Sequence, residues 1–502
     1  MRYGFVIDQD RCIGCHACTV ACKEEHNIPI GVFRTWVKYI EKGEFPNTSR
    51  HFGVMRCNHC DDAPCIEICP TVSLFRRSDG IVDFDPDRCI GCKSCMQACP
   101  YDAIYIDPAS NTAAKCNFCA HRVELNLEPA CVIVCPTQAI IAGDLDNPAS
   151  KPSRMVAAQK VTSRKPHKGT EPKLFYVGID GDLLEPAAPL QEENFFWSDR
   201  RPDSPRSDLP AGYSETRPGA SRVVYDISHP APWGWKIGSY IWTKSIAAGA
   251  LLVEAFLMSA GYESGIAPLS FPAASLALLF VAITGILLIW DLKRPERFYF
   301  LFTKPNPHSW VVWGAYILLA YGLCSFIWTA LVIQQGWVPP SLVVIGAIFA
   351  IATAGYTAFL FGQARGRDFW EGPVLVWQLI VHAFAAGSAI LLLASAILGT
   401  GGRSAEILPR ILLGSLLLSG VMVFCEFALV ARGTDARRAI DFLTRGELRN
   451  EFWLGAIGLG IVVPAILILA GWGIALASIL ALGGLWLWES LFVRAGQAVA
   501  LS

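Results

Sequence analysis

Long apolar runs are almost absent from the first half of this sequence, and cysteine is almost absent from the second half. Nearly all extended apolar segments follow Trp235, whereas only two of the eighteen cysteines, Cys324 and Cys425, follow Cys135. A chain of 502 residues with this division is too long and too uneven for one hydrophobic core. The sequence therefore predicts a water-soluble head followed by a membrane domain.

Three further absences narrow the function. The net charge of −1 gives no indication of nucleic-acid binding. The first residues have no apolar stretch, twin arginine or small-residue cleavage site, so we expect no signal peptide and a cytoplasmic head. In that reducing compartment, clustered cysteines indicate metal ligands and not disulfides. The head also has no glycine-rich dinucleotide motif and no nucleophile beside a base, so we expect substrate chemistry in a separate subunit.

The cysteines of residues 1–143 form four groups of four. The first and third groups have C-x2-C-x2-C-x3-C spacing, and the other two each have one wider gap. The groups are Cys12, Cys15, Cys18 and Cys22; Cys57, Cys60, Cys65 and Cys69; Cys89, Cys92, Cys95 and Cys99; and Cys116, Cys119, Cys131 and Cys135. Three thiolates on a tight loop can bind one cubane iron–sulfur cluster, while the fourth reaches a neighbouring cluster. Structural zinc is the alternative, but zinc sites lack the third close cysteine and the trailing Cys-Pro.

With all sixteen positions filled by cysteine, the head resembles the four-cluster ferredoxin subunits of the complex iron–sulfur molybdoenzyme family, which are DmsB- and PsrB-like. The resemblance implies four [4Fe-4S] clusters. It also implies their ligands: Cys12, Cys15, Cys18 and Cys135; Cys22, Cys116, Cys119 and Cys131; Cys57, Cys60, Cys65 and Cys99; and Cys69, Cys89, Cys92 and Cys95.

Residues 144–235 are rich in proline, serine and charge, with one expected strand at 173–179. This composition favours an extended linker over a third core. The linker is either a solvated tether or an arm that holds a partner subunit.

Residues 236–502 contain eight apolar segments long enough to cross a bilayer. We expect spans at 237–260, 270–290, 310–333, 340–363, 372–399, 408–431, 452–472 and 474–494, with seven as the alternative count because only a Gly-Trp-Gly turn separates the last two. Twelve Lys or Arg residues fall on the head side of these spans, against two, Arg403 and Arg410, on the other side. The positive-inside rule then places the head in the cytoplasm, attached to the cytoplasmic membrane.

The segments at 290–316 and 356–370 resemble the NrfD/PsrC family of quinone-reactive membrane subunits. The resemblance covers about 260 residues and implies quinone binding at the head-side ends of the spans. Only one histidine, His382, lies deep in a span, so we expect no haem. The sequence thus predicts an α+β fusion protein. A ferredoxin-like double dicluster domain is followed by an all-α polytopic membrane bundle of about eight helices.

Ionisable residues within the spans are the candidates for quinone and proton exchange, because such groups are costly in lipid. Lys244, His382 and Glu426 are the chosen residues, with Gln378 and Glu489 at similar depth; each has a structural ion pair or hydrogen bond as its alternative. Asp291, Arg294 and Arg297 are expected to anchor a loop under the head, and Glu254, deeper in the first span, is a candidate proton-path residue. Cys324 and Cys425 are expected to be packing residues.

The leading hypothesis is therefore electron transfer between a soluble cytoplasmic catalytic partner, of the molybdenum- or tungsten-pterin type by family resemblance, and the quinone pool. One rival hypothesis is a redox-driven ion pump, which the position of Glu254 deep in the first span suggests. The other is a redox sensor or assembly scaffold, which four complete clusters make a poor choice. The sequence does not name the substrate of the partner or the direction of electron flow.

Overall fold

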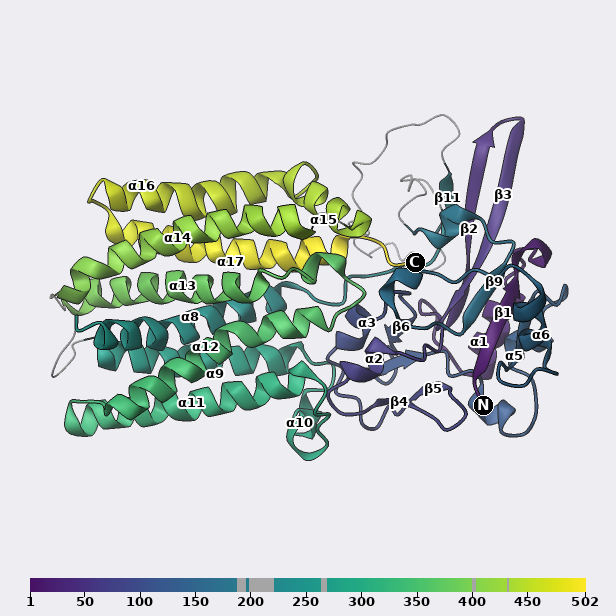
Figure 1. Cartoon of the computed structure of the whole chain (residues 1–502), viewed down its shortest axis with the longest axis horizontal. Helices are drawn as coiled ribbons and strands as arrows, with labels where there is room; N and C mark the ends of the chain where they lie inside the picture. The colour runs from purple at the N-terminus through teal and green to yellow at the C-terminus, as the bar shows by residue number, and fades with distance from the viewer. Residues whose placement is uncertain (187–195, 198–220, 263–268, 400–402, 431–432) are drawn as a thin grey trace.

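A computed structural model describes residues 1–186, 196–197, 221–262, 269–399, 403–430 and 433–502. Figure 1 shows two parts along the long axis of the molecule: a head of short strands and helices, and a bundle of long helices. The chain passes from head to bundle once, and its last residues return to the boundary between them. The predicted α+β head and all-α membrane domain are therefore both confirmed.

Among the residues that the structure describes, eight helical segments are long and apolar enough to cross a membrane. They are formed by α8 (Trp235–Ser259), α9 (Ser270–Asp291), α11 (Trp310–Gln335), α12 (Pro340–Gly362), α13 (Leu375–Leu398), α14 (Arg403–Val430), the pair η5 (Glu451–Val462) and α16 (Val463–Leu469), and α17 (Ile474–Ala498). Every predicted span is present within a few residues, although the predicted end of the sixth, residue 431, lies outside the described residues. The count is eight and not seven, because Gly471 and Gly473 adopt positive φ between the last two helices.

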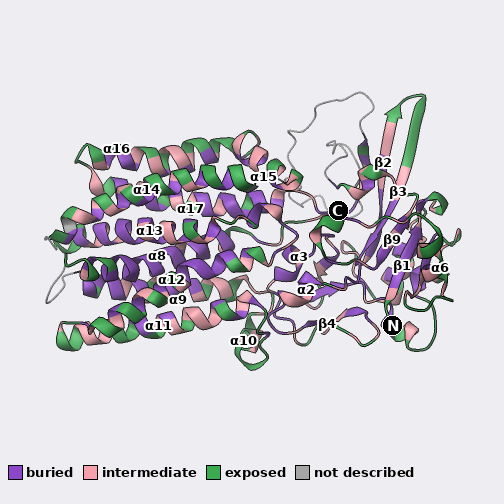
Figure 2. Cartoon of the chain, viewed as in Figure 1, coloured by how far each residue is buried: buried purple, intermediate pink, exposed green. Residues whose placement is uncertain are grey.

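Helix α8 forms the centre of the bundle. It packs against α9, α12, α13 and α17, and nearly all its residues from Ile237 to Leu257 are buried. Its contact with α13 depends on two glycines, since a Cβ on Gly249 would lie 1.8 Å from the carbonyl oxygen of Ala383. Figure 2 shows the contrast with the outer helices, whose outward faces carry exposed apolar side chains suited to lipid.

The seventh span and the loop before it contain features that hydropathy did not predict. Residues Glu451–Val462 form a π-helix of twelve residues, although π-helices are usually single turns. An amphipathic helix, α15 (Thr434–Thr444), lies between the sixth and seventh spans. Arg403 and Arg410, expected in a loop, instead belong to the first turns of α14.

In the described part of the chain, the head contains four small sheets. One has the order β8-β1-β9, formed by Ile140–Asp144, Tyr3–Asp8 and Leu174–Val177; the next has the order β10-β11-β2-β3, formed by Phe196–Trp197, Arg222–Asp226, Thr35–Glu44 and Asn47–Arg56. Two hairpins complete the set: β4-β5 (Leu74–Arg76, Val82–Phe84) and β6-β7 (Ile104–Ile106, Ala113–Lys115). Short helices α1 (Ala17–Glu25), α2 (Pro64–Glu67), α3 (Ser94–Ala98), α4 (Ala120–Val123) and α5 (Ala130–Ile133) carry or follow the cysteines.

The described part of residues 144–235 packs on the head. The expected strand at 173–179 is β9, which pairs in parallel with β1, and β11 pairs with β2 farther along the segment. Helix α6 (Lys151–Ala158) packs against β8. The most proline-rich stretch, 198–212, lies outside the described residues.

Candidate iron–sulfur and membrane redox sites

The loop that opens each cysteine group has the same backbone turn. Two residues after the first cysteine, the chain adopts positive φ: 69° at Gly14, 48° at His59, 68° at Gly91 and 62° at Phe118. Glycine tolerates this conformation, whereas histidine and phenylalanine are strained in it. Such strain persists where the surrounding structure requires it, and here the chain turns at the same position in every group.

A second repeated turn follows the last cysteine of three groups. Where proline comes next, the residue three positions after the cysteine has positive φ: Val72, Asp102 and Gln138. Cys22, which is followed by Lys23, lacks this turn and lies within helix α1. The four cysteine groups of the sequence therefore share one backbone turn, and three of them share a second.

The sixteen cysteines of the head are free thiols. The family resemblance divides them into four expected sets, and the electrostatic neighbours of several thiols include members of the same expected set. Cys12 lies near Cys135 and Cys15. In the other sets, Cys22 lies near Cys116, Cys131 and Cys119; Cys65 lies near Cys99, Cys57 and Cys60; and Cys95 lies near Cys92, Cys89 and Cys69.

Contacts between the sets place them in a row. Cys18 of the first set interacts with Cys131 of the second, Cys57 of the third interacts with Cys116 of the second, and Cys65 of the third interacts with Cys95 of the fourth. For clarity these are called sets A (with Cys12), B (with Cys22), C (with Cys65) and D (with Cys95). A [4Fe-4S] cluster takes four cysteine thiolates. Burial raises the pKa of the Cys18 thiol to about 12, so a metal would be needed to hold it as thiolate.

Backbone and side-chain N–H groups point at several of these sulfurs. The amides of Gly91 and Ala113 donate to the sulfur of Cys89 at 3.4 and 3.3 Å. His26 Nε2 lies 3.2 Å from the sulfur of Cys119, and burial lowers the pKa of His26 to about 4, so this ring is neutral. Hydrogen bonds to cluster sulfurs are one determinant of reduction potential.

Set D rests directly on the membrane domain. In the loop between α9 and α11, the amide of Lys293 donates to the carbonyl of Gly91 at 3.2 Å. Arg297 Nη1 donates to the carbonyl of Cys89 at 3.0 Å, and Asn306 Nδ2 donates to that of Cys69 at 2.8 Å. A Cβ on Gly91 would lie 2.6 Å from Cβ of Lys293, so the approach is close.

The boundary residues Asp291, Arg294 and Arg297 anchor the head, as their position in the sequence indicated. Asp291 forms an ion pair with Lys93, which lies within the loop of set D, at 2.7 Å. Arg294 Nε donates to the carbonyl of Ser110 at 2.8 Å.

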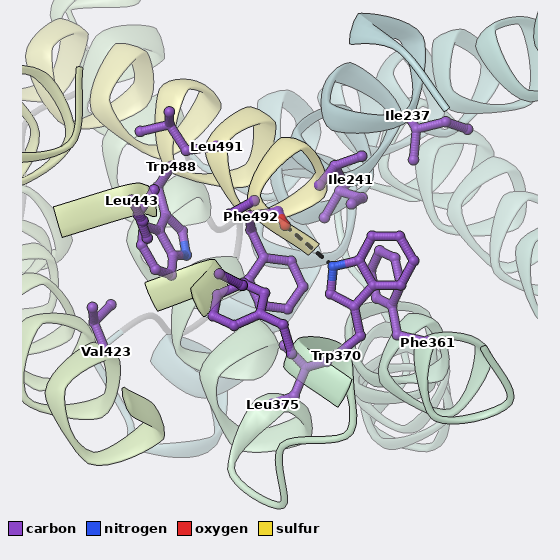
Figure 3. Packing of buried hydrophobic residues seen from close by; sticks show 14 of the residues in the cluster. Ile237, Ile241, Phe361, Trp370, Leu375, Val423, Leu443, Trp488, Leu491 and Phe492 are labelled. Carbon is purple, nitrogen blue, oxygen red and sulfur yellow. Dashed lines mark hydrogen bonds between the residues drawn. The ribbon is translucent and has the colours of Figure 1, made fainter. Parts of the chain in front are cut away.

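An aromatic cluster separates set D from the interior of the bundle. Trp233 Nε1 donates to the carbonyl of Cys92 at 3.3 Å, and its ring stacks on Trp370 at 5.5 Å between centroids. Figure 3 shows Trp370 beside Phe361 and donating from Nε1 to the carbonyl of Phe492, at 3.2 Å. Trp488 lies farther along the same cluster.

Two of the three predicted membrane site residues come together, around a residue outside the predicted set. Lys244 Nζ donates to Thr357 Oγ1 at 2.8 Å and to the carbonyl of Ala354 at 2.9 Å. His382 Nε2 lies 3.1 Å from Ser419 Oγ, and its Nδ1 lies 3.6 Å from the carboxylate of Glu489. The charges of Lys244 and Glu489 also interact, so Glu489 is the common neighbour; its matching depth was the signal in the sequence.

Glu426 stands apart from this group. Its carboxylate lies against Gly372, where a Cβ would be only 1.3 Å from Oε1. Gly372 lines a hollow of about 610 Å³ at the head-side ends of α12 and α13, with Phe359, Trp370 and Glu371 among its walls. A much smaller cavity, about 20 Å³, lies beside His382 and Ser419 and faces the π-helix. The hollow is large enough for a ring-sized ligand, and the cavity has room for about one water.

Gln378 is buried in the same layer. Glu254 is fully buried in α8, ten residues beyond Lys244, or about 15 Å farther from the head at helical rise. Cys324 is buried in α11, whereas Cys425 is exposed on α14, where a lipid-facing position explains it without packing.

Comparison with known proteins gives matches over both parts. Residues 3–24 match a 4Fe-4S binding domain, residues 49–145 match a 4Fe-4S dicluster domain, and residues 224–500 match the family described as polysulphide reductase, NrfD.

Similar proteins cover the head. The B subunit of the tetrathionate reductase of Salmonella typhimurium is 44% identical over 189 residues, which are 37% of this chain and 76% of that protein. Protein NrfC of Escherichia coli is 44% identical over 180 residues, 35% of this chain and 81% of the relative. The arsenate respiratory reductase iron-sulfur subunit ArrB of a Shewanella species is 35% identical over 227 residues, 35% of this chain and 96% of the relative. In this chain, such a head and an NrfD-type membrane part are fused.

Proposed function

Because this protein belongs to the polysulphide reductase NrfD family, we propose that it carries electrons between a cytoplasmic catalytic subunit and the membrane quinone pool. The chain is an iron–sulfur electron-transfer subunit with a multi-pass membrane part, of the kind found in reductase complexes. We propose in addition that it binds four clusters, reacts with quinone, pairs with a molybdenum or tungsten enzyme and has its head in the cytoplasm. The observation that carries this proposal is the row of sets A to D ending on the head-side loops of the spans.

We assign one [4Fe-4S] cluster to each of sets A to D. Bound there, such clusters supply one-electron transfer. The residues supply thiolates, N–H donors to sulfur and an enclosed environment. Purified protein should contain about sixteen iron and about sixteen sulfide atoms per chain; zinc in their place would refute the assignment.

The catalytic partner is proposed to dock at set A, the end of the row farthest from the membrane. Cys15 is exposed there, and Ile13, Val20 and Ile133 are exposed apolar residues close to set A or B in sequence. The names of the relatives include those of reductase subunits, which supports a partner that holds its own catalytic cofactor, molybdenum or tungsten pterin in our proposal. Copurification with such a partner tests this. Ile133→Glu should weaken the association while leaving cluster content unchanged, because a charge would be desolvated at the contact.

Quinone is proposed to react at the head-side layer of the bundle, with no haem involved. A two-electron reduction of quinone also takes two protons, and Lys244, His382 and Glu426 are the proposed exchangers. His382 lies 3.6 Å from the carboxylate of Glu489, and the charge of Lys244 interacts with the same carboxylate at longer range, so these groups are proposed to exchange protons with one another. Glu426 lies at the wall of the hollow through which a quinone ring can enter.

Lys244→Ala and His382→Ala test this site. Each should lower quinol oxidation by at least tenfold, with unchanged iron content. Wild-type rates in both variants would remove the site assignment. Gly285→Ala is the control, because this glycine near the head-side end of α9 has open space around it and lines neither the hollow nor the small cavity.

The head is proposed to face the cytoplasm. The loops that hold Lys293, Arg365 and Arg445 lie at the head side of the bundle, and such positive charge is retained in the cytoplasm. Protease should reach the head in inverted vesicles and not in intact cells.

Ion translocation is a second candidate function. Glu254 is a fully buried carboxylate about 15 Å beyond the proposed quinone layer, where quinone chemistry does not need it. Proton movement into sealed vesicles during turnover, abolished by Glu254→Gln with quinol oxidation retained, would support this function. Turnover without proton movement beyond the quinone chemistry would exclude it.

A further inference from the structure

A basic residue directly precedes the first cysteine of every group. These residues are Arg11, Arg56, Arg88 and Lys115. Their surroundings differ, because Arg11 is exposed and Arg88 is half-buried, whereas Arg56 is 1% and Lys115 is 0% exposed. Two of the four cations are thus completely removed from water, and they precede the second and fourth groups.

Arg56 has sulfur as its anionic neighbour. Its Nη1 donates to the sulfur of Cys131 at 3.3 Å, and its Nη2 donates to the hydroxyl of Thr35 at 3.0 Å. The ring of Phe5 lies under the guanidinium, 4.4 Å from its centroid. Within the described residues, no carboxylate lies within ion-pair distance of Arg56.

Lys115 has the same kind of surroundings. Its ammonium donates to the carbonyls of Val82 and Cys116, the latter at 2.9 Å. Its charge acts on the thiols of Cys57 and Cys65, in set C. Among the residues that the structure describes, it too has no carboxylate partner.

Other buried lysines of the head do have such partners. Lys173 binds Asp61 at 2.9 Å, Lys38 binds Asp226 at 3.2 Å, and Lys93 binds Asp291 at 2.7 Å. A buried cation is costly unless an anion compensates it. A carboxylate supplies the anion at Lys173, Lys38 and Lys93. At Arg56 and Lys115 the neighbours are cysteine sulfurs instead, which points to charge that a bound group would provide.

The two cations are related by the duplication of the head. Arg56 precedes the second cysteine group and reaches Cys131 of the fourth group, whereas Lys115 precedes the fourth group and reaches Cys57 and Cys65 of the second. Each therefore crosses to the opposite half. Both lie near the centre of the row, where sets B and C meet at Cys116 and Cys57.

We propose that Arg56 and Lys115 are the built-in counter-ions of the two central clusters, in sets B and C, and raise their reduction potentials. The inference rests on the cluster assignment proposed above. A four-thiolate cluster is anionic and becomes more so when an electron arrives from its neighbour, without any bond being made or broken. A fixed cation in a medium of low dielectric favours that extra charge. The centre of the row then holds electrons more strongly than it would without these cations.

The test uses the full-length, cluster-loaded protein with Arg56→Gln, Lys115→Met and the charge-conserving variants Arg56→Lys and Lys115→Arg. Midpoint potentials are followed by redox titration with electron paramagnetic resonance. Removing either charge should lower the reduced-to-oxidised ratio of a central cluster at fixed potential by at least tenfold, which is about 59 mV for a one-electron couple. In the charge-conserving variants, the midpoint potentials of the central clusters should stay close to those of the unsubstituted protein.

Lys173→Met is the matched control, because Lys173 is equally buried but binds Asp61, which keeps Arg2 as a second partner at 2.7 Å. It should leave all four potentials unchanged. Unaltered potentials in Arg56→Gln and Lys115→Met with full iron content would overturn the inference while leaving the cluster assignment intact. If the charge-removing variants fail to retain iron, restored iron in Arg56→Lys and Lys115→Arg supports the counter-ion role, and equal loss in them refutes it. Zinc, or iron far below the expected content, in the unsubstituted protein would instead refute the assignment itself.

Discussion

At the scale of single residues, Gly91 joins the chemistry of the head to the geometry of the membrane domain. Its φ of 68° belongs to the left-handed region, and its missing side chain lets Lys293 approach to donate a hydrogen bond to its carbonyl. The same glycine therefore shapes the loop of set D and permits the head to sit on the bundle.

Gly91→Ala is expected to destabilise the protein by about 1–2 kcal/mol from backbone strain alone, with a further cost from the contact with Lys293. Electron transfer from the head to quinone should slow, because the loop of set D would shift relative to the loop between α9 and α11. Thermal unfolding and the rate of quinone reduction by prereduced head would measure this. Gly285→Ala is the control and should change neither quantity, because an added Cβ at this helical glycine would meet no neighbouring atom within 4 Å.

His229 is a second residue whose effect can be stated in advance. Burial alone would lower its pKa, but Asp102 at 2.5 Å and Asp226 at 3.5 Å raise the pKa of His229 to about 10. A histidine whose pKa is higher in the folded state than in the unfolded state stabilises the folded state. This stabilisation is complete when the pH is below the pKa of the unfolded state, near 6.5. That stabilisation is lost as the pH rises from about 6.5 to about 10.

His229→Gln should therefore lower the free energy of unfolding by roughly 1–3 kcal/mol at pH 6, because charged Asp102 loses its partner. The difference from the unsubstituted protein should shrink towards pH 10. Denaturant unfolding at several pH values measures it. A difference that stays constant from pH 6 to pH 10 would contradict the assigned protonation.

At the scale of elements, helix contacts in the bundle depend on paired glycines. Gly484 of α17 meets Gly460 of the π-helix so closely that a Cβ on Gly484 would lie 2.0 Å from the Cα of Gly460. Gly483, next in sequence, has open space around it. Small residues at such contacts let two helix backbones approach in a membrane.

Gly484→Ala should thus cost about 1–3 kcal/mol by overpacking, and it should also displace the wall of the small cavity beside His382. Gly483→Ala should be silent. Thermal stability in detergent and quinol oxidation would separate the two variants, and equal behaviour would show that the π-helix and α17 do not meet as described.

The elements also show how far the sequence could be read. The eight spans were predictable within a few residues because hydropathy measures what lipid requires. The division of the sixteen cysteines into four cluster-binding sets stays a prediction of the family resemblance, in which four thiolates bind the four irons of one cluster. The π-helix, by contrast, has the same apolar composition as an α-helix, so no pattern distinguished it. The role of Glu489 was hidden as well, since depth alone does not show that Lys244 and His382 share it.

At the scale of the whole molecule, the even number of spans and the charged loops predict one orientation. Arg445 follows α15 at the head side, with a side chain 83% exposed, and Trp472 lies in the turn between the last two helices at the other end.

Arg445→Cys should react with a membrane-impermeant thiol reagent only in inverted vesicles, and Trp472→Cys only in intact cells with a permeable outer layer. The unsubstituted protein is the control for labelling of native cysteines. The reverse pattern of labelling would place the head on the outer face of the membrane.

The hydrogen bonds that hold set D on the loop between α9 and α11 join two parts of a single polypeptide. Neither part can diffuse away from the other, so the contact forms at a high effective concentration and needs little affinity of its own. On the proposed function, passage of an electron from the head to a quinone at the bundle is consequently a first-order event. Diluting the purified protein a hundredfold should leave the rate of electron transfer per molecule the same. If the head were supplied as a separate subunit, this rate would fall on dilution.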